Sequence, residues 1–440
     1  MKAQVIGGGL AGCEAAWALA KAGITVELFE MKPLKFSPAH HNPDLAELVC
    51  SNSLKAKRIG SAAGMLKEEM RLLGSLLVPC AEATSVPAGG ALAVDRDAFS
   101  ALVTEKINNH PRIQIIHGEI KDLHFSHPAV IATGPLTSEA FSQEMKNLCG
   151  GNLSFYDAAA PIITYDSIDR EKVFFGARYQ RGEDDYINCP FSKEEYEAFY
   201  DALIHAEVAK LAEFDKRQVY EGCMPIEVMA KRGADTIRYG PMRPVGLKDP
   251  KTGHRPWANV QLRRENREGT LYNIVGFQTN LKFGEQKRVF SMIPGLEHAE
   301  FMRYGVMHRN FFIDSPRLLN RDFSFRQNKD LYFAGQITGV EGYMESAMSG
   351  LLAGKYLAAQ MRGITLPKLP EDTMCGALST YISTGGTAEF QPMGANMGIL
   401  PMLDKQIKEK QQRYELLAER GLSHLREIAA AWDRLDMQEG

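Results

Sequence analysis

One cysteine of the chain has neighbours that leave its chemistry open. Cys50 stands in the stretch LVCSNSL (residues 48–54), with apolar residues before it and three small polar residues after it. A cysteine that only packs behaves as a small hydrophobic residue, whereas a reactive cysteine acts as its thiolate. The seven cysteines are widely spaced and form no CxxC pair, which argues against a zinc site or a disulfide framework. Packing and thiol chemistry remain as readings of Cys50, and the cysteine usage fits the cytoplasm.

A glycine motif near the N-terminus predicts a dinucleotide site. Gly7, Gly9 and Gly12 form a GxGxxG that follows the short apolar strand AQVI and precedes the alanine-rich stretch CEAAWALAKA. Glu30 ends the next strand, TVELFE, 18 residues after Gly12. The glycines allow a tight turn and close approach of a pyrophosphate to the helix N-terminus, and the acid can bind ribose hydroxyls. The strand–turn–helix context favours this reading over a purely structural glycine turn.

Two later segments indicate FAD rather than NAD as the bound dinucleotide. AVIATG is a strand ending at Gly134, and LYFAGQITGVEGYMESAMSGLLAG (331–354) is a strand, a glycine loop and a helix. The chain has no second GxGxxG, so a nicotinamide would react at the same flavin face and leave. The predicted cofactor-binding residues of these segments are Gly7, Gly8, Gly9, Leu10, Ala11, Gly12, Glu30, Gly134, Gly335 and Gln336.

The pattern of elements predicts an α/β fold with two parts, since 440 residues exceed one simple core. Strands at 112–120 and 129–134 join the first βαβ unit in a doubly wound parallel sheet, and helices are expected over 64–77, from near Asp95, and after Pro401. Residues 1–160 and 296–440 are predicted to form a discontinuous Rossmann-like FAD-binding domain. Residues 161–295 are predicted to form an inserted α+β domain, with a helical region over 191–214 and antiparallel strands over 240–283.

Several segments together carry a family resemblance that spans nearly the whole chain: CSNSL, VPAGGALAVDRDAFS, IATGPLTSEA, GPMRPVGL, VGFQTNLKFGEQKR, MIPGLEHAEFMRYGVMHRN, GVEGYMESA and EFQPMGANMGILP. They resemble the bacterial folate- and FAD-dependent tRNA (uracil-5-)-methyltransferases. The resemblance implies that 5,10-methylenetetrahydrofolate donates a carbon to C5 of uridine 54 in the T-loop of tRNA. It also implies that FAD, reduced by NADH or NADPH, supplies the electrons.

The resemblance gives two cysteines functional roles. Uracil C5 is a poor nucleophile, and a thiolate adding at C6 makes it enolate-like. Cys223, in EGCMPIEVMAKRG, is expected to be that nucleophile, and Cys50 is expected to take the C5 proton or to protect the flavin adduct. The opposite assignment, with Cys50 as the nucleophile and Cys223 in the other role, stays open. The five other cysteines are expected to pack: Cys13, Cys80, Cys149, Cys189 and Cys375.

The resemblance also implies a pocket for the folate and the flavin. Its expected lining is His308, Arg309 and Asn310 in GVMHRN, with Gly342 and Tyr343 in GVEGYMES. Tyr343 would stack or hydrogen bond near the pterin. Glu341 and Glu345 have two readings, pterin contact and helix capping.

With a formal net charge of −3, the chain has no overall positive electrostatic field that would attract nucleic acid, so RNA contacts must be local. We expect no metal, and no apolar run reaches the roughly 18 residues that a membrane helix needs. Alternatives are a paralogue that methylates ribosomal RNA, an RNA-binding flavoprotein without transfer chemistry, and a flavin oxidoreductase of a small molecule. The candidate RNA contacts are Arg263, Arg264, Arg267, Lys282, Phe283, Lys287, Arg288, Lys405, Lys408, Lys410 and Arg413.

Overall fold

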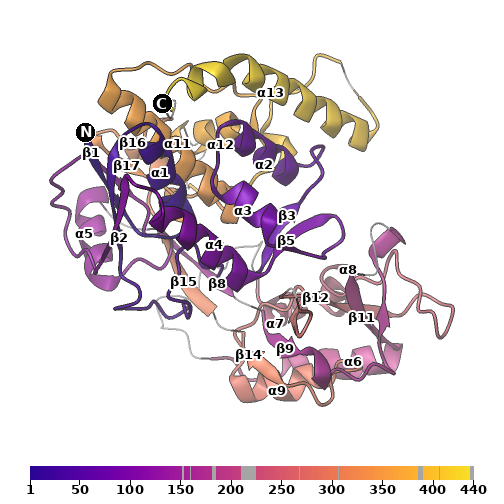
Figure 1. Cartoon of the computed structure of the whole chain (residues 1–440). Helices are drawn as coiled ribbons and strands as arrows, with labels where there is room; N and C mark the ends of the chain where they lie inside the picture. Colours follow the sequence, from indigo (N-terminus) through magenta and orange to yellow (C-terminus); the bar gives the residue numbers. More distant parts are fainter. Residues whose placement is uncertain are drawn as a thin grey trace.

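The structure is a computed structural model that describes residues 1–150, 153–158, 160–180, 185–209, 224–266, 268–305, 307–384, 390–405 and 407–436. Its first part is built on a six-stranded sheet in the order β16-β17-β7-β1-β2-β6 (Figure 1). Every neighbouring pair is parallel except the edge pair β16–β17. This confirms the predicted α/β class. The strands are β1 (Lys2–Ile6), β2 (Thr25–Glu30), β6 (Ile113–His117), β7 (Ala129–Ile131), β16 (Ser324–Phe325) and β17 (Asn328–Phe333).

Helices α1 (Leu10–Lys21) and α11 (Tyr343–Arg362) pack unusually closely in this part. A Cβ on Gly350 would lie 2.0 Å from the Ala11 carbonyl oxygen, and one on Gly354 would lie 2.7 Å from that of Ala15. The small residues of both helices therefore let the backbones touch. The other helices of the part are α2 (Ala62–Leu72), α3 (Leu77–Ala83), α4 (Arg96–Asn108), α5 (Glu139–Cys149), α10 (Ser315–Leu318), α12 (Met374–Thr384) and α13 (Lys410–Asp433).

One predicted helix has the wrong extent, and two other predicted helices are present in the structure. The single helix expected over 64–77 is two helices, because Gly74 adopts φ +81° and turns the chain between α2 and α3. Helix α4 begins after Asp95, whose side chain accepts a hydrogen bond from the Ala98 amide at 3.0 Å. The helix expected after Pro401 is α13, which lies along the top of Figure 1.

The second part has its own antiparallel sheet, in the order β10-β11-β12-β13-β9-β14. Its core is a chain of aromatic rings, with Phe199 lying 5.5 Å from Phe191 and 6.1 Å from Phe277 between ring centroids. The strands are β9 (Ile162–Thr164), β10 (Phe174–Phe175), β11 (Tyr186–Phe191), β12 (Ala258–Arg264), β13 (Leu271–Ile274) and β14 (Phe301–Arg303). The helices are α6 (Lys193–Ile204), α7 (Ile226–Ala230), α8 (Ala234–Tyr239) and α9 (Phe283–Phe290).

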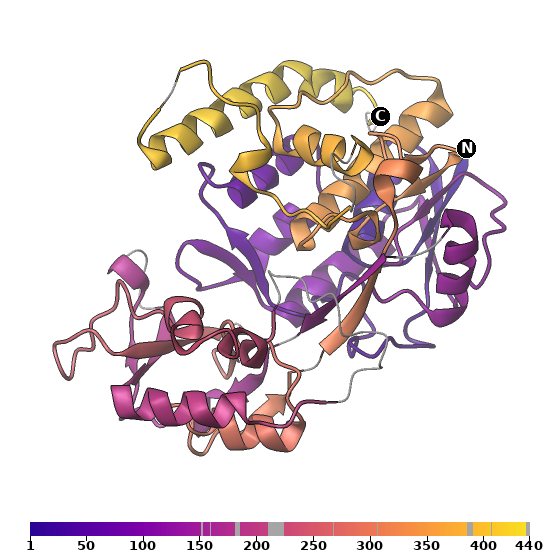
Figure 2. The same cartoon turned by 180° about the vertical axis from the view of Figure 1, so that it is seen from behind.

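Two small sheets complete the molecule. β8 (Leu153–Ala158) pairs with β15 (Met307–Phe312) and runs between the two parts, as both views show (Figures 1 and 2). β3 (Ser53–Ala56), β4 (Ser85–Val86) and β5 (Ala91–Val94) form the other. β14 belongs to the second sheet although it follows residue 295, and the domain limits 1–160, 161–295 and 296–440 stay a prediction. Within the described ranges, no helix is both long and apolar enough to span a bilayer.

Candidate active site

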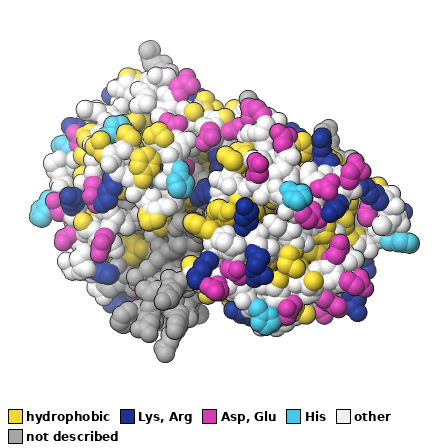
Figure 3. All heavy atoms as spheres, turned by 90° about the horizontal axis from the view of Figure 1, so that it is seen from below, with side chains coloured by type: hydrophobic (Ala, Val, Ile, Leu, Met, Phe, Trp, Pro, Cys, Tyr) yellow, Lys and Arg dark blue, Asp and Glu magenta, His cyan; other side chains and the backbone are white. Residues whose placement is uncertain are grey.

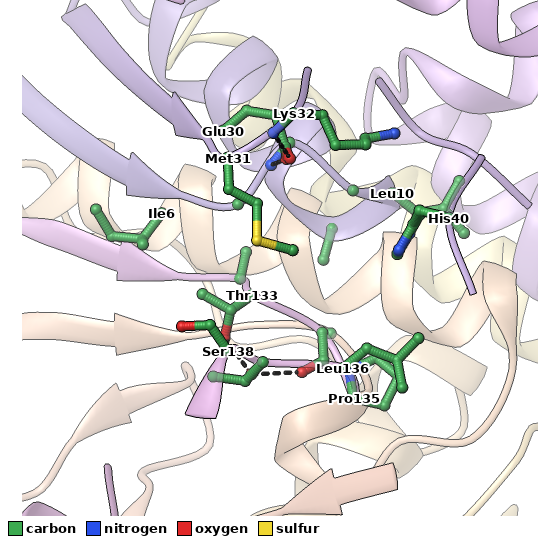
Figure 4. A pocket seen from close by; sticks show the side chains of 18 of the residues that line it. Ile6, Leu10, Glu30, Met31, Lys32, His40, Thr133, Pro135, Leu136 and Ser138 are labelled. Carbon is green, nitrogen blue, oxygen red and sulfur yellow. Dashed lines mark hydrogen bonds between the residues drawn. The ribbon is translucent and has the colours of Figure 1, made fainter. Parts of the chain in front are cut away.

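A large cavity opens at the carboxyl ends of the parallel strands, where α/β sheets bind their ligands. It encloses about 1130 Å³ of atom-free space including its open mouth. Figure 4 shows Glu30, Met31 and Lys32 on one side and Thr133, Pro135 and Leu136 on the other. The cavity is also lined by these predicted cofactor-binding residues: Gly7, Gly8, Gly9, Leu10, Ala11, Gly134, Gly335, Gln336 and Tyr343.

The glycine loop has the geometry of a phosphate cradle. A Cβ on Gly12 would lie 1.7 Å from the Gly7 carbonyl oxygen, so only glycine lets α1 start this close to β1. A Cβ on Gly9 would meet nothing within 4 Å, which leaves the backbone open towards the cavity. Gly12 is not part of the lining and acts by allowing the close approach. These are the backbone features that a bound pyrophosphate needs.

Glu30 holds the glycine loop as well as facing the cavity. Its Oε2 accepts a hydrogen bond from the Gly8 amide at 2.7 Å, and its Oε1 accepts one from the Lys32 amide at 2.9 Å. Each carboxylate oxygen retains a second lone pair. Glu30 therefore fixes the loop that would carry the pyrophosphate and can still accept a hydrogen bond, while its contact with a ribose hydroxyl stays a prediction.

The irregular segment over residues 35–54 suggests an active-site loop, but reasoning from sequence missed the parts that Lys32 and His40 take in it. The buried Lys32 ammonium donates to the carbonyl oxygens of Asn42, at 2.9 Å, and Asp44, and it pairs with Glu47 at 3.3 Å. His40, on the loop closed in this way, lines the cavity. A basic residue two positions after the strand end gives no recognisable signal. Residues 135–138 were also missed, although their segment IATGPLTSEA carried part of the resemblance.

The late glycine segment reaches the same cavity. The Gly335 amide donates to Ser349 Oγ at 2.7 Å, and Gln336 Nε2 donates to Glu341 Oε2 at 2.8 Å. Gly342 has φ +120° and immediately precedes α11, but it is not part of the lining. The N-termini of α1 and α11 thus both face the cavity, with Leu10 and Tyr343 in its wall.

Tyr343 connects this wall to Cys50. Its hydroxyl oxygen accepts hydrogen bonds from the backbone amides of Cys50 at 2.7 Å and Ser51 at 3.0 Å. Burial raises the pKa of Tyr343 above its usual value, so the phenol stays neutral. Cys50 itself is partly exposed, and the preceding Val49 lines the cavity. The structure therefore brings the Cys50 loop next to the predicted cofactor site.

Two arginines of the second sheet also hold this loop. Arg263 donates to Asn52 Oδ1 at 2.9 Å and to Ser51 Oγ at 2.8 Å, and Arg303 donates to the Val49 carbonyl oxygen at 2.9 Å. Arg263 is buried, with 7% of its surface exposed. The expectation that Arg263 contacts RNA is therefore wrong, because its guanidinium is enclosed between the two parts.

The remaining described cysteines are enclosed to different degrees. Cys13, Cys80, Cys189 and Cys375 are buried, and burial raises the pKa of each thiol, to about 11 for Cys80. Cys149 is partly buried, and desolvation raises its pKa to about 12. These surroundings agree with packing roles.

The predicted nucleophile Cys223 lies outside the described residues, as does Arg267. Described residues on both sides of the Cys223 segment form backbone hydrogen bonds with residues 278–280. The Ala209 amide donates to the Asn280 carbonyl oxygen at 2.8 Å, and the Ile226 amide donates to that of Gln278 at 2.7 Å. His308, Arg309 and Asn310 lie on β15, where their backbones pair with residues 155–157 of β8.

The two glutamates beside Tyr343 have partners within the protein. Glu345 is buried, and its Oε1 pairs with Lys55 at 2.7 Å and accepts from the Ala395 amide at 3.0 Å. It thus joins α11 to β3 and to the chain after α12. Within the described ranges, no group of three or more His, Cys, Asp or Glu side chains could hold a metal ion.

The other RNA candidates are spread over the molecule. Phe283 is exposed, and its ring stacks on that of Tyr304 with 5.0 Å between the centroids. Tyr304 directly follows Arg303 in the chain. Lys405, Lys408 and Lys410 are exposed near the start of α13, at the opposite end of the first part from the second sheet (Figures 1 and 2). Figure 3 shows Lys and Arg interspersed with Asp and Glu over the face seen from below. This mixed surface fits local RNA contacts better than one broad basic field.

Comparisons with known proteins agree with this site. The chain matches the family described as "Glucose inhibited division protein A" over residues 2–365. It is 56% identical to the methylenetetrahydrofolate–tRNA-(uracil-5-)-methyltransferase TrmFO of Acetivibrio thermocellus over 98% of this chain and 99% of the relative. The enzyme of that name from Halalkalibacterium halodurans is also 56% identical, over 96% of this chain and 97% of the relative.

A solved structure shows the same fold at low sequence identity. Aquifex aeolicus GidA superposes with a TM-score of 0.71 at 17% identity, covering 99% of this chain and 75% of that one. The fold alone follows from this likeness, whereas the 56% identity over almost the full length establishes the family. The chain belongs to the TrmFO family of methylenetetrahydrofolate–tRNA-(uracil-5-)-methyltransferases.

Proposed function

We propose that this chain is a cytoplasmic enzyme that forms 5-methyluridine at position 54 in the T-loop of tRNA. The carbon comes from 5,10-methylenetetrahydrofolate, and NADH or NADPH reduces the flavin. The observation that carries the proposal is the 56% identity to TrmFO of Acetivibrio thermocellus over 98% of the chain. The cavity at the sheet's carboxyl edge supplies a place for the cofactor that this reaction needs.

FAD fits the residues of the cavity. Gly9 leaves the loop open for a pyrophosphate, Glu30 offers oxygens to a ribose, and the N-terminus of α1 favours a negative group. Gly335 and Gln336 would lie along the other half of the cofactor, with Tyr343 beside them. When bound and reduced, FAD supplies the two electrons that convert a transferred methylene group into a methyl group.

Cys223 is the residue that we assign to activation of the uracil. Its sulfur would form a bond to C6 while the C5–C6 π electrons move to C5, which then attacks the one-carbon unit. The bond from that carbon to its carrier nitrogen breaks, and the nitrogen keeps the electron pair. Loss of the C5 proton and departure of the sulfur restore the C5–C6 double bond. Ala209 and Ile226, which flank its segment, both bond to residues 278–280, and Phe283 and Tyr304 connect that stretch to Arg303. This continuity supports action of Cys223 and Cys50 at one site.

Cys50 is the residue that we assign to the C5 proton. Tyr343 fixes the backbone of Cys50, and Val49 lines the cavity beside it. A base at this position would receive the proton next to the cofactor cavity. His308, Arg309 and Asn310 remain the proposed folate contacts.

An RNA methylation assay tests the proposal. Holoenzyme is incubated with methylenetetrahydrofolate, NADPH and either unmodified tRNA transcript or ribosomal RNA, and 5-methyluridine is measured by mass spectrometry. We expect product with tRNA, loss of product in Cys223→Ala and Cys50→Ala, and retention in Cys149→Ser as the control.

Other outcomes would contradict particular parts of the proposal. Product with ribosomal RNA alone favours the paralogue. Oxidation of NADPH without product in either RNA favours an oxidoreductase of a small molecule. Full turnover of Cys223→Ala would refute its role as the nucleophile.

A further inference from the structure

Three guanidinium groups converge on the backbone around Cys50. Arg96, at the start of α4, donates to the carbonyl oxygens of Leu48 at 2.9 Å and Cys50 at 3.3 Å. Arg303 donates to the Val49 carbonyl oxygen at 2.9 Å, and Arg263 donates to Ser51 Oγ at 2.8 Å. We call Arg96, Arg263 and Arg303 the arginine clamp. Its members come from α4, β12 and β14, so both parts of the protein hold the same loop.

The carboxylates near the clamp are fewer than its cations. Glu265 pairs with Arg96, and the side chains of this pair are only 5% and 12% exposed, respectively. Glu47 also faces Arg303, but its carboxylate is engaged by the Lys32 ammonium at 3.3 Å. The neutral phenol of Tyr343 adds no charge. Positive charge therefore exceeds negative charge around Cys50 in a poorly solvated region, where each charge acts strongly.

The clamp members repel one another. Burial lowers the pKa of Arg303, and the neighbouring charge of Arg96 lowers it further. Burial likewise lowers the pKa of Arg263, with Arg96 acting in the same direction, while Tyr186, Glu265 and Cys50 oppose the fall. Negative charge on the Cys50 sulfur would thus relieve the repulsion between buried guanidinium groups. Nearby cations favour the thiolate form of a cysteine for the same reason.

We propose that the arginine clamp holds Cys50 as a thiolate before any substrate binds, and that this makes Cys50 ready to take a proton. Arg96, Arg263 and Arg303 are then positioning residues that act through Cys50. The assignment of the C5 proton to this thiolate rests on the proposed function, whereas the ionised state does not. In the transfer, the sulfur receives the proton and becomes the neutral thiol, and the electron pair of the C5–H bond stays on the uracil.

Cys149 provides an internal reference. It is also partly exposed, but desolvation alone raises its pKa to about 12. Two cysteines of comparable exposure in one protein should therefore differ in how their alkylation depends on pH. A difference between the two pH midpoints reports the surroundings of each thiol, because limited access of the reagent slows alkylation at every pH and leaves the midpoint unchanged.

Alkylation of the holoenzyme by iodoacetamide tests the proposal without RNA or folate. The rate at Cys50 and Cys149 is followed by peptide mass spectrometry across a pH series. For Cys50 we expect a midpoint below the ~8.5 of a free thiol. Arg303→Gln, which removes charge from the least buried clamp member, should raise the midpoint by about one pH unit. Arg303→Lys, which keeps the charge, should leave it near the wild-type value, and the exposed Arg288→Gln is the control.

Two results would overturn the proposal. One is a wild-type midpoint for Cys50 at or above that of a free thiol. The other is an equal effect of Arg303→Gln and Arg303→Lys, which would mean that the clamp acts by position alone. Flavin absorbance of each variant shows whether it still folds around its cofactor. Absence of methylation by the wild type, together with a Cys50 midpoint below that of a free thiol and the expected shift in Arg303→Gln, would count against the proposed function and leave the thiolate in place.

Discussion

At the scale of single residues, Tyr343 holds Cys50 through an unusual use of its hydroxyl group. A tyrosine hydroxyl commonly donates its proton to a carbonyl oxygen, as the partly buried Tyr200 does to Ala230 at 3.1 Å. Tyr343 instead accepts two backbone N–H groups, from Cys50 and Ser51. Two amide donors of the loop therefore depend on one oxygen atom.

Tyr343→Phe should destabilise the protein by more than Tyr200→Phe. The first change leaves two partly buried N–H donors without an acceptor, at up to ~1–3 kcal/mol each, whereas the second leaves one carbonyl oxygen. Urea unfolding followed by circular dichroism measures the difference. Equal losses of unfolding free energy in the two variants would contradict this account of the loop.

Gly12→Ala should abolish FAD retention. Its methyl group would lie 1.7 Å from the Gly7 carbonyl oxygen, so the glycine loop must move away from α1. The flavin-to-protein absorbance ratio after purification is the measurement, and added FAD should no longer raise the melting temperature. Gly90→Ala is the control, because a Cβ there meets nothing within 4 Å. Normal flavin content in Gly12→Ala would refute the role of this close contact.

Some of the site residues could be predicted from the sequence, and others could not. GxGxxG and Glu30 were found because their chemistry depends on local spacing, and Cys50 was singled out by its polar flank. The arginines around Cys50 were not found, because Arg263 and Arg303 are brought to it from distant strands. A basic residue in a strand looks exposed until the partner surface is known.

At the scale of elements, a buried glutamate joins α2 to α12. Glu69 accepts hydrogen bonds from the amides of Met374 and Cys375, both at 2.7 Å, and so satisfies the first turn of α12. Its carboxylate is completely enclosed, and burial raises its pKa to about 7. The cap therefore carries a proton over part of the physiological pH range.

Stability should fall as the pH rises through the range governed by Glu69. The unfolded chain releases this proton near 4.5 and the folded chain near 7, so between these values the folded state holds more protons. The free energy of unfolding then decreases with rising pH, and it should decrease less steeply in Glu69→Gln. Denaturant titrations across this interval measure the slope, with the exposed Glu105→Gln as the control. Identical slopes in wild type and Glu69→Gln would contradict the raised pKa.

The elements themselves follow from local patterns, but their ends and contacts do not. The βαβ start, the Asp95 cap and the closing segment at 331–354 were predicted because each has its own signal. The helix over 64–77 was extended too far, since its apolar spacing continues past Gly74. The cap from Glu69 to α12 joins residues more than 300 positions apart, and no periodicity reports such a contact.

At the scale of the whole molecule, the two sheets share the Cys50 loop. Asn52 Nδ2 donates to the carbonyl oxygens of Val94 in the first part and Arg264 in the second, at 3.0 Å each. Its Oδ1 accepts from Arg263, so a single buried amide joins both parts. The second part therefore fixes the loop beside the cofactor cavity, and both ends of the Cys223 segment also meet this part.

The origin of the methyl carbon tests the central claim most directly. Holoenzyme is incubated with tRNA transcript, NADPH and methylenetetrahydrofolate that carries carbon-13 in its methylene group, and the T-loop nucleosides are analysed by mass spectrometry. We expect 5-methyluridine at position 54 with carbon-13 in its methyl group. The absence of 5-methyluridine, or a methyl group without the label, would contradict the account.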